Sequence, residues 1–589
     1  TWARCAGPRG AAVGFAFGAT GRRAPRSAFA ATEEGVWRSD DAGATWADVS
    51  AGLPWKGLRS FAGGFDAKGR AAMLYVAIPS RRGARGEFTG GVWRSADGGA
   101  TWESAMGPGA NVDTQAADQW AMGEIAEYHH VLTTDAEPFR VYAFNANTGV
   151  RPPHHTAVFR SDDAGRTWRP TFQPDPRFPG HNVEPDYTTT ADGQFYQAVP
   201  YGVAICATDP DVVMQVDAGN CIQTADGGRT WSNGHARAAG KGAFECTGLV
   251  VTSTWNWYAD PFEPARHYVA YTDIGFARSL DAGKAWRTWG KDEKAPWKNT
   301  TYELAFDPEV PGRLWGAFSD VHDIPNDNVI SGRHRATGGG GVCVSTDFAE
   351  HWKAVPGLPA APCTSIVVDP RSPRGRRRLY AGFFGEGVHA SADDGATWTA
   401  RNAGLGSNSN CRVVRVHLHA DGTLFALVTA LRDGDRWDET GPGLYRSADQ
   451  GVTWTRILST LQWPKDFTVD PEDGRTIWVG AADAAGKEQG GLYRTGDGGA
   501  TWARVAREGP QHFGAYLSPH HGGWVYMTLC EGAPAAGLWL SKDGGRTWGP
   551  IDGLPFNTVQ RVAFDPKDRD RIYVTTFGGS VWTGPAAPR

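Results

Sequence analysis

The sequence is poor in several features that would point to particular classes of protein. None of its apolar runs approaches the ~20 residues that a membrane-spanning helix needs, which excludes a membrane-spanning segment. Its 59 lysines and arginines are interspersed among 64 aspartates and glutamates, giving a formal charge of -5. Without a basic patch, binding to nucleic acid is not expected. Phosphate loops, nucleotide fingerprints and Ser/His/Asp triads are also missing.

Cysteine is scarce as well, since the chain holds only 8 cysteines in 589 residues. Such a content does not define a disulfide framework. Cys363 and Cys411 each precede a predicted innermost strand in successive repeats, so we expect a bond between them if the protein is extracellular. The chain opens on Thr1 and Trp2 with neither an initiator methionine nor a signal peptide, which is typical of a mature or trimmed product.

Glycine (77), proline (37) and tryptophan (26) are abundant, a composition that favours short strands joined by tight turns. The pattern Ser/Thr-x-Asp-x-Gly-x-Thr-Trp recurs along the chain, which indicates a repeat architecture. The eight regular copies are 39–46, 95–102, 161–168, 224–231, 391–398, 447–454, 495–502 and 541–548. Two degenerate copies lie at 279–286 and 345–352.

Each copy has the chemistry of a folding device. The aspartate can accept backbone N–H groups in a tight turn, the glycine can adopt positive φ, and the tryptophan can bury a large ring. The copies resemble the Asp box (BNR repeat) of sialidases, the xyloglucanase family and sortilin-type receptors, over essentially the whole chain. The resemblance implies a β-propeller, with the boxes on the face opposite the functional site. The sialidase arginine segment, Phe/Tyr-Arg-Ile-Pro, is absent, so a sialidase is the weaker interpretation.

Three strand-like runs recur around each box, and the residues after the box supply a fourth strand. We therefore predict an all-β fold of about eleven four-stranded blades over residues 1–589. Residues 1–5 resemble a strand that follows a box, and we expect them to complete the blade of 559–589 and so clasp the two ends. This favours one large ring, with two tandem rings as the alternative. Long loop excursions are expected at 103–130, 169–200, 232–246 and 320–340.

Acidic residues recur in the loops between the second and third strands, on the face opposite the boxes. The segment Tyr271-Thr-Asp-Ile-Gly275 resembles the xyloglucanase segment that carries a catalytic aspartate, and Asp320 is the nearest counterpart of the second one. Glycoside hydrolysis uses two such carboxylates, one as general acid and the other as base or nucleophile. We therefore predict Asp273 and Asp320 as the catalytic pair, with hydrogen bonds to neighbouring loops as the alternative role.

Other side chains are candidates for binding the substrate. Aromatic rings can stack on sugar faces, and polar side chains at the rim can hydrogen-bond to hydroxyl groups. The predicted substrate-binding residues are Trp255, Trp257, Trp297, Glu386, His322 and Asp323. Packing within a blade is the alternative role for each tryptophan. No metal site and no cofactor are predicted, because no zinc-like ligand spacing occurs.

The box at 345–352 has alanine and histidine where glycine and threonine are expected. Positive φ costs about 1 kcal/mol for a residue with a Cβ, so we expect this turn to relax into another form at Ala349. The adjoining excursion is predicted to place Asp320, His322, Asp323 and His334 at the ligand site.

The leading functional hypothesis is a secreted or cell-surface bacterial protein, extracellular or periplasmic, that hydrolyses a polysaccharide. The alternative is a non-catalytic, sortilin-like or surface-assembly propeller that binds a peptide, a protein or a glycan. Fold alone does not decide between them.

Overall fold

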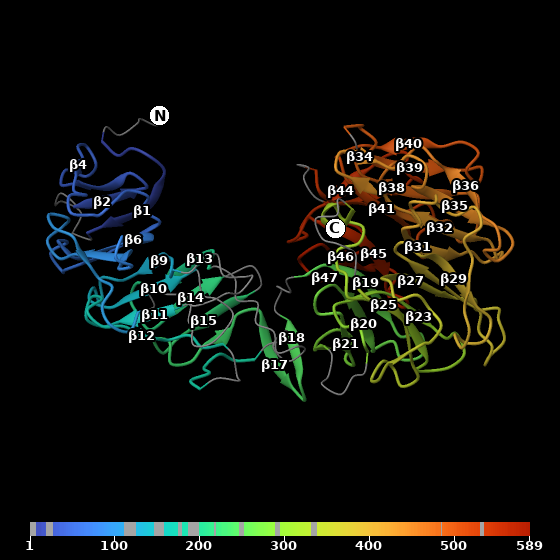
Figure 1. Cartoon of the computed structure of the whole chain (residues 1–589), viewed down its shortest axis with the longest axis horizontal. Helices are drawn as coiled ribbons and strands as arrows, with labels where there is room; N and C mark the ends of the chain where they lie inside the picture. Colours follow the sequence, from blue (N-terminus) through green and yellow to red (C-terminus); the bar gives the residue numbers. More distant parts are fainter. Residues whose placement is uncertain are drawn as a thin grey trace. The chain divides into compact units, whose positions relative to one another are not determined.

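The computed structural model is nearly all β and divides into two compact units (Figure 1). The first unit holds the described residues up to Arg237, and the second those from Ala238 onward. The structure describes the whole chain except residues 1–6, 19–26, 111–124, 147–157, 175–178, 186–199, 217–219, 247–251, 289–294, 331–337, 485, 531–534 and 589.

The described residues of the first unit form four antiparallel four-stranded sheets, each a meander in chain order. The first two sheets consist of β1 (Ala12–Phe17), β2 (Ala28–Thr32), β3 (Gly35–Ser39), β4 (Ala47–Asp48), and β5 (Ser60–Phe65), β6 (Ala71–Arg82), β7 (Phe88–Ser95), β8 (Glu103–Ser104). The next two consist of β9 (Tyr128–Leu132), β10 (Val141–Asn145), β11 (Val158–Ser161), β12 (Arg169–Pro170), and β13 (Gly202–Ile205), β14 (Val213–Val216), β15 (Cys221–Thr224), β16 (Ser232–Asn233).

The second unit contains six four-stranded sheets and a final three-stranded sheet among its described residues. The first three are β19 (Thr254–Ala259), β20 (His267–Tyr271), β21 (Phe276–Ser279), β22 (Arg287–Thr288); β23 (Thr300–Phe306), β24 (Leu314–Ser319), β25 (Gly340–Ser345), β26 (Lys353–Ala354); and β27 (Cys363–Val368), β28 (Leu379–Phe383), β29 (Gly387–Ser391), β30 (Thr399–Ala400). The next three are β31 (Val413–Leu418), β32 (Leu424–Val428), β35 (Gly443–Ser447), β36 (Thr455–Leu458); β37 (Pro464–Val469), β38 (Ile477–Ala481), β39 (Gly491–Thr495), β40 (Ala503–Ala506); and β41 (His512–Leu517), β42 (Val525–Leu529), β43 (Gly537–Ser541), β44 (Gly549–Ile551). The last is β45 (Val559–Phe564), β46 (Arg571–Thr576), β47 (Val581–Pro585).

Three smaller elements lie outside these sheets. The hairpin β17 (Ala236–Gly240) and β18 (Ala243–Cys246) spans the point at which the units divide. The hairpin β33 (Arg432–Asp433) and β34 (Arg436–Trp437) interrupts the fourth sheet of the second unit, and the short helix α2 (Asp327–Ile330) lies between β24 and β25.

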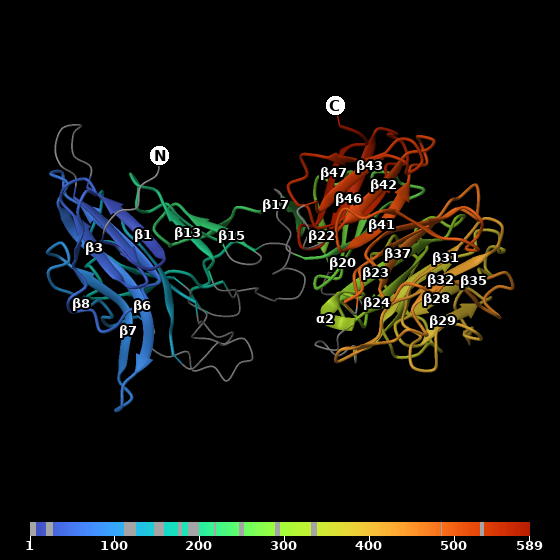
Figure 2. The ribbon, with the colours of Figure 1, turned by 90° about the horizontal axis from the view of Figure 1, so that it is seen from above.

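The sheets of the second unit close on themselves, because the first sheet packs against the last (Figure 1, Figure 2). The Trp257 ring on β19 stacks on the Tyr573 ring of β46 with their centroids 3.5 Å apart. Arg561 Nη1 on β45 donates to the carbonyl oxygen of Trp255 at 3.0 Å. This closure within one unit does not fit the preferred expectation of a single ring through the whole chain. The expected clasp by residues 1–5 lies outside the described residues.

The repeated Ser/Thr-x-Asp-x-Gly-x-Thr-Trp segments, called boxes below, join the third and fourth strands of their sheets. In the box after β35, the Asp449 carboxylate accepts the Thr453 N–H at 2.9 Å and the Thr453 hydroxyl at 2.6 Å. The Ser447 hydroxyl donates to the same carboxylate at 2.7 Å and accepts the Gly451 N–H at 2.8 Å. These bonds, above all the Thr453 hydroxyl, lower the pKa of Asp449 to about 2. The box aspartate is thus committed to holding its turn.

The degenerate box at 345–352 keeps this shape, so the expectation that it would relax was wrong. Ala349 takes φ of 63° and donates its N–H to the Ser345 hydroxyl at 2.9 Å, as the usual glycine does. The His351 ring replaces the missing threonine hydroxyl, with Nδ1 2.7 Å from Asp347 Oδ2. The retained hydrogen bonds offset the cost of positive φ at an alanine.

Neighbouring sheets are joined by two kinds of side-chain hydrogen bond. The Trp502 indole N–H in one box donates at 2.8 Å to the carbonyl oxygen of Ile457, on the fourth strand of the preceding sheet. The second kind of bond runs from a sheet to the following one: Arg160 Nη1 on β11 donates at 3.0 Å to the carbonyl oxygen of Gly227, in the box of the next sheet. Trp286, in the first box of the second unit, donates instead to Gly283 of its own box at 3.0 Å. Its neighbouring sheet, β45–β47, has no fourth strand among the described residues.

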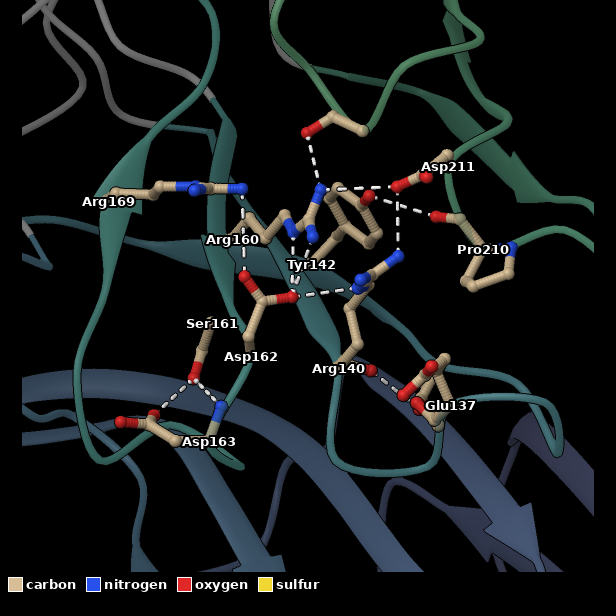
Figure 3. Close-up of polar contacts among 12 residues, drawn as sticks. Glu137, Arg140, Tyr142, Arg160, Ser161, Asp162, Asp163, Arg169, Pro210 and Asp211 are labelled. Atoms are coloured by element: carbon tan, nitrogen blue, oxygen red, sulfur yellow. Dashed lines mark hydrogen bonds and ion pairs between the residues drawn. The ribbon is translucent and has the colours of Figure 1, made fainter.

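The Arg160 contact belongs to an ionic cluster between the third and fourth sheets of the first unit (Figure 3). Arg140 and Arg160 converge on Asp162 at 2.7 Å each. Both also reach Asp211 of the following sheet, at 2.9 and 3.3 Å, and the Tyr142 hydroxyl donates to the Pro210 carbonyl. The cluster pairs its charges internally and so joins two sheets.

The innermost strands of the second unit bury a further charged network. Asp466 on β37 is fully enclosed and accepts Arg415 of β31 at 2.9 Å and Arg561 of β45 at 2.8 Å. The Tyr516 hydroxyl of β41 donates to the same carboxylate at 2.9 Å. Buried charges are tolerated when they are paired and hydrogen-bonded, and here the pairing ties three separate sheets together.

The predicted disulfide between Cys363 and Cys411 is not formed, and both thiols are free. Cys363 is buried and its thiol contacts the carbonyl oxygen of Ser365, whereas the Cys411 thiol contacts that of Leu405. Each thiol thus contacts a backbone carbonyl close to it in the sequence and not the other cysteine.

Candidate functional site

Asp273 lies in the loop between β20 and β21, where it adopts φ of 60°. Aspartate tolerates this left-handed conformation better than most residues. The Thr252 hydroxyl donates to Asp273 Oδ2 at 3.0 Å, and His322 Nδ1 lies 3.0 Å from Oδ1. The neighbouring Ile274 is buried, so the loop is anchored while the carboxylate stays partly exposed.

The segment after β24 brings Asp320, His322 and Asp323 to this loop. Val321 and Ile324 are buried on either side of His322, and Tyr302 holds both through its hydroxyl. That hydroxyl donates to the Val321 carbonyl at 2.9 Å and accepts the Ile324 N–H at 3.1 Å. The partly exposed His322 is therefore presented to Asp273 by a fixed backbone.

The charges around His322 favour its protonated form. The hydrogen bond to Asp273 raises the pKa of His322, partial burial opposes this, and the nearby Asp323 carboxylate at 3.8 Å adds to the rise. An imidazole with a raised pKa can carry a proton at neutral pH.

Asp320 and Trp297 lie together beside the Gly339 backbone. A Cβ placed on Gly339 would lie 2.8 Å from Trp297 Nε1 and 3.3 Å from Asp320 Oδ2. A Cβ placed on Gly341 would lie 2.5 Å from the Trp297 ring. Although Asp320 is exposed, neighbouring atoms remove part of its water, and this desolvation raises the pKa of its carboxyl group. The glycines thus leave room for an acid with a raised pKa next to an indole.

The same excursion then crosses to another sheet. The Pro325 carbonyl accepts the Trp463 indole N–H at 3.1 Å, next to β37, and Lys465 Nζ lies 3.1 Å from Asn326 Oδ1. The excursion therefore contacts the Asp273 loop at His322 and the sheet of β37 at residues 325 and 326. His334 lies outside the described residues.

Two predicted binding residues belong to the core, which corrects their assignment. Trp255 is 1 % exposed and donates its indole N–H to the Thr272 hydroxyl at 2.7 Å. Trp257 is 5 % exposed beneath the Tyr573 ring. Both rings are enclosed and offer no face to a sugar, because they lie within the innermost strand β19 and not in a loop.

Glu386 is not brought to Asp273 by any contact among the described residues. It is exposed in the loop between β28 and β29, and it lines a separate cavity of about 380 Å³. The structure therefore brings His322 and Asp323 to Asp273, places Asp320 beside Trp297 at the start of the same excursion, and leaves Glu386 on the following sheet.

Two residues of the site were missed by sequence reasoning. Thr252 holds Asp273 Oδ2, and Tyr302 fixes the backbone on both sides of His322. Tyr302 lies on the innermost strand β23, where its pattern is that of a core residue, and Thr252 belongs to no motif. No local signal in the sequence could have identified either of them.

The site has the groups needed for general acid and base chemistry, namely an acid with a raised pKa, a fixed carboxylate and an imidazole. Among the described residues, no group of three or more histidine, cysteine or acidic side chains is arranged to hold a metal ion. The described part of the chain also has no helix long and apolar enough to cross a membrane.

Comparison with known proteins relates the chain to others through its structure. No protein-family model matches it, and no curated protein does. The GH74 xyloglucanase from Xanthomonas campestris is similar with a TM-score of 0.55 and 18% identity, over 98% of this chain and 74% of that one. The GH74 enzyme of Niastella koreensis is similar with a TM-score of 0.52 and 15% identity, over 95% of this chain and 80% of that one. At such identities the likeness concerns the fold alone, and it supports a β-propeller.

Proposed function

We propose that the protein is a secreted or cell-surface glycoside hydrolase that acts on a polysaccharide. The observation that carries the proposal is the 3.0 Å contact between His322 and Asp273. It joins the loop of Asp273 to the excursion that begins at Asp320, on the neighbouring sheet. We further propose that the seven sheets of this unit form one Asp-box propeller ring.

The chemistry assigns different roles to the two carboxylates. Desolvation raises the pKa of Asp320, which is the direction that a general acid needs, and we assign this residue the role of donating a proton to the glycosidic oxygen. Asp273 is held in place by hydrogen bonds from Thr252 and His322, and we assign it the role of base or nucleophile. Trp297, beside Asp320, is the aromatic surface against which a sugar ring can stack.

One observation favours a second candidate, a non-catalytic binding propeller. Both oxygens of Asp273 already accept hydrogen bonds, Oδ1 from His322 and Oδ2 from Thr252. A carboxylate engaged in this way can stabilise a loop without taking part in a reaction. The same face would then bind a glycan or a peptide unchanged.

A panel of polysaccharides distinguishes the two candidates. Release of reducing ends and retention on immobilised polysaccharide are measured for the wild type, Asp273→Asn and Asp320→Asn, with the exposed Asp552→Asn as matched control. Hydrolysis that is lost in the first two variants and kept in the control supports the hydrolase. Retention without release by the wild type supports the binder. Neither release nor retention with any polysaccharide would overturn both glycan assignments.

A further inference from the structure

A cavity of about 380 Å³ lies on the sheet that follows the candidate site. It is formed by the loop between β28 and β29 and the loop between β30 and β31. Its size is within the ~300 to 1,000 Å³ typical of small-molecule pockets. Beside three glycines, the lining residues are Glu386, Asn402, Leu405, Ser407, Asn408 and Cys411.

The walls of this pocket are fixed by hydrogen bonds of the protein itself. The N–H groups of Gly385 and Gly387 both donate to the Cys411 carbonyl at 3.2 Å, which joins the two loops. Asn402 donates to the Glu386 carbonyl at 3.0 Å and accepts the Val388 N–H at 2.8 Å. The pocket therefore has its shape before a ligand enters, which lowers the entropic cost of binding.

Glu386 is the only charged residue among those that line the pocket. Its side chain is exposed, and within the described part of the chain its carboxylate has no ion pair and no hydrogen bond. Burial raises the pKa of the Cys411 thiol to about 11, so the thiol is uncharged at neutral pH. Arg412, which follows Cys411 in the chain, lies over the Phe384 ring at 4.9 Å and is not part of the lining. An uncompensated negative charge therefore stands in a polar pocket.

The pocket adjoins the candidate site through the protein interior. Phe384, two residues before Glu386, is buried in the same cluster as Val321 and Ile324, which flank His322. The strands β23 and β24 also pack against β27, the innermost strand of the pocket's sheet. The pocket and the excursion that carries Asp320 thus lie on neighbouring sheets that share a buried core.

We propose that this pocket binds a sugar residue carrying a protonated amino group, so that the preferred glycan is a polysaccharide with free hexosamine units. The Glu386 carboxylate pairs with the ammonium group, and the side chains of Asn402, Ser407 and Asn408 meet the hydroxyl groups. The proposal rests on the glycan-directed function proposed above, and it names the class of sugar.

The test compares the binding of three tetrasaccharides to the full chain by calorimetry: glucosamine tetramer, its N-acetylated form and cellotetraose. The wild type is expected to bind the glucosamine tetramer at least tenfold more tightly than the other two, and this preference should weaken as salt is added. Glu386→Gln should reduce the preference at least fivefold, whereas the exposed Asp552→Asn should leave it unchanged. Glu386 is exposed, so folding of the variant is expected and is checked by its thermal midpoint.

Equal affinity of the wild type for the glucosamine and N-acetylated tetramers would overturn the inference, as would a preference that persists in Glu386→Gln. Hydrolysis is measured separately, so the two proposals can fail independently. A preference for the amino sugar without hydrolysis of any polysaccharide would support the amino-sugar pocket and overturn the hydrolase proposal. Hydrolysis without any preference would overturn the amino-sugar pocket and support the hydrolase proposal.

Discussion

His322 Nδ1 lies 3.0 Å from Asp273 Oδ1, and this contact joins loops from two neighbouring sheets of the second unit. Both side chains are partly exposed: 35% of the His322 side chain and 24% of the Asp273 side chain is accessible to solvent. The contact makes the stability of the site depend on the protonation of one imidazole.

The first prediction concerns this pH dependence. The pKa of His322 is raised in the folded protein, so the added stability is fully present below its ordinary value of about 6.5 and is lost as pH rises through the raised value. His322→Gln should therefore lower the thermal midpoint at pH 5.5 and have little effect at pH 9. Solvent screening limits the effect to about 1 kcal/mol or less. Equal losses at both pH values would contradict the assignment, and the exposed His181→Gln serves as control.

The second prediction concerns the buried network. Asp466→Asn should destabilise the protein by about 3 kcal/mol, because the buried carboxylate that two partly buried arginines, Arg415 and Arg561, share would lose its charge. Denaturant unfolding measures the loss. The exposed Asp435→Asn should cost less than about 0.5 kcal/mol. Equal stability of the two variants would show that the network is not needed to join the sheets.

The third prediction concerns the degenerate box. Ala349→Gly should stabilise the protein by about 1 kcal/mol, because glycine adopts the φ of 63° without strain. Ala396, in a regular box, does not have positive φ, and Ala396→Gly should give no gain. Thermal midpoints of both variants are compared with the wild type. A loss of stability in Ala349→Gly would mean that the alanine methyl contributes more than its backbone costs.

The fourth prediction concerns acid stability of the boxes. The pKa of Asp449 is lowered to about 2 by hydrogen bonds, first of all from the Thr453 hydroxyl. Its contribution is therefore present above the ordinary value of about 3.9 and is lost as pH falls toward 2. Asp449→Asn should be less stable than the wild type at pH 7, with the difference shrinking between pH 4 and 2. A difference that grows on acidification would contradict this role. Urea midpoints across this range provide the measurement.

The all-β fold was predictable because the Asp box is a local pattern. Ser447, Asp449, Gly451 and Thr453 lie within seven residues and hold one another, so the motif specifies its own turn. The division into two units was not predictable in this way. It depends on contacts such as Trp257 with Tyr573, which lie far apart in the sequence and have no distinguishing pattern.

The candidate site was predictable in part for the same reason. Asp273 and Asp320 follow second strands of neighbouring sheets, a position that the repeat reveals. Trp255 and Trp257 were assigned by residue type alone, although their places on an innermost strand bury them. Thr252 and Tyr302 act through hydrogen bonds to residues far away in the sequence, and no spacing in the sequence predicts these bonds.

The central claim is that Asp320 donates a proton to the leaving group. The most direct test is to measure how the rate loss of the Asp320→Asn variant depends on the leaving group. The rates of Asp320→Asn and wild type are compared on the preferred polysaccharide and on an aryl glycoside of the same sugar with a nitrophenolate leaving group. Because nitrophenolate needs no protonation, the variant should lose about 10² to 10⁴ in rate on the polysaccharide and less than about tenfold on the aryl glycoside. Wild-type rates of the variant on both substrates would contradict the account.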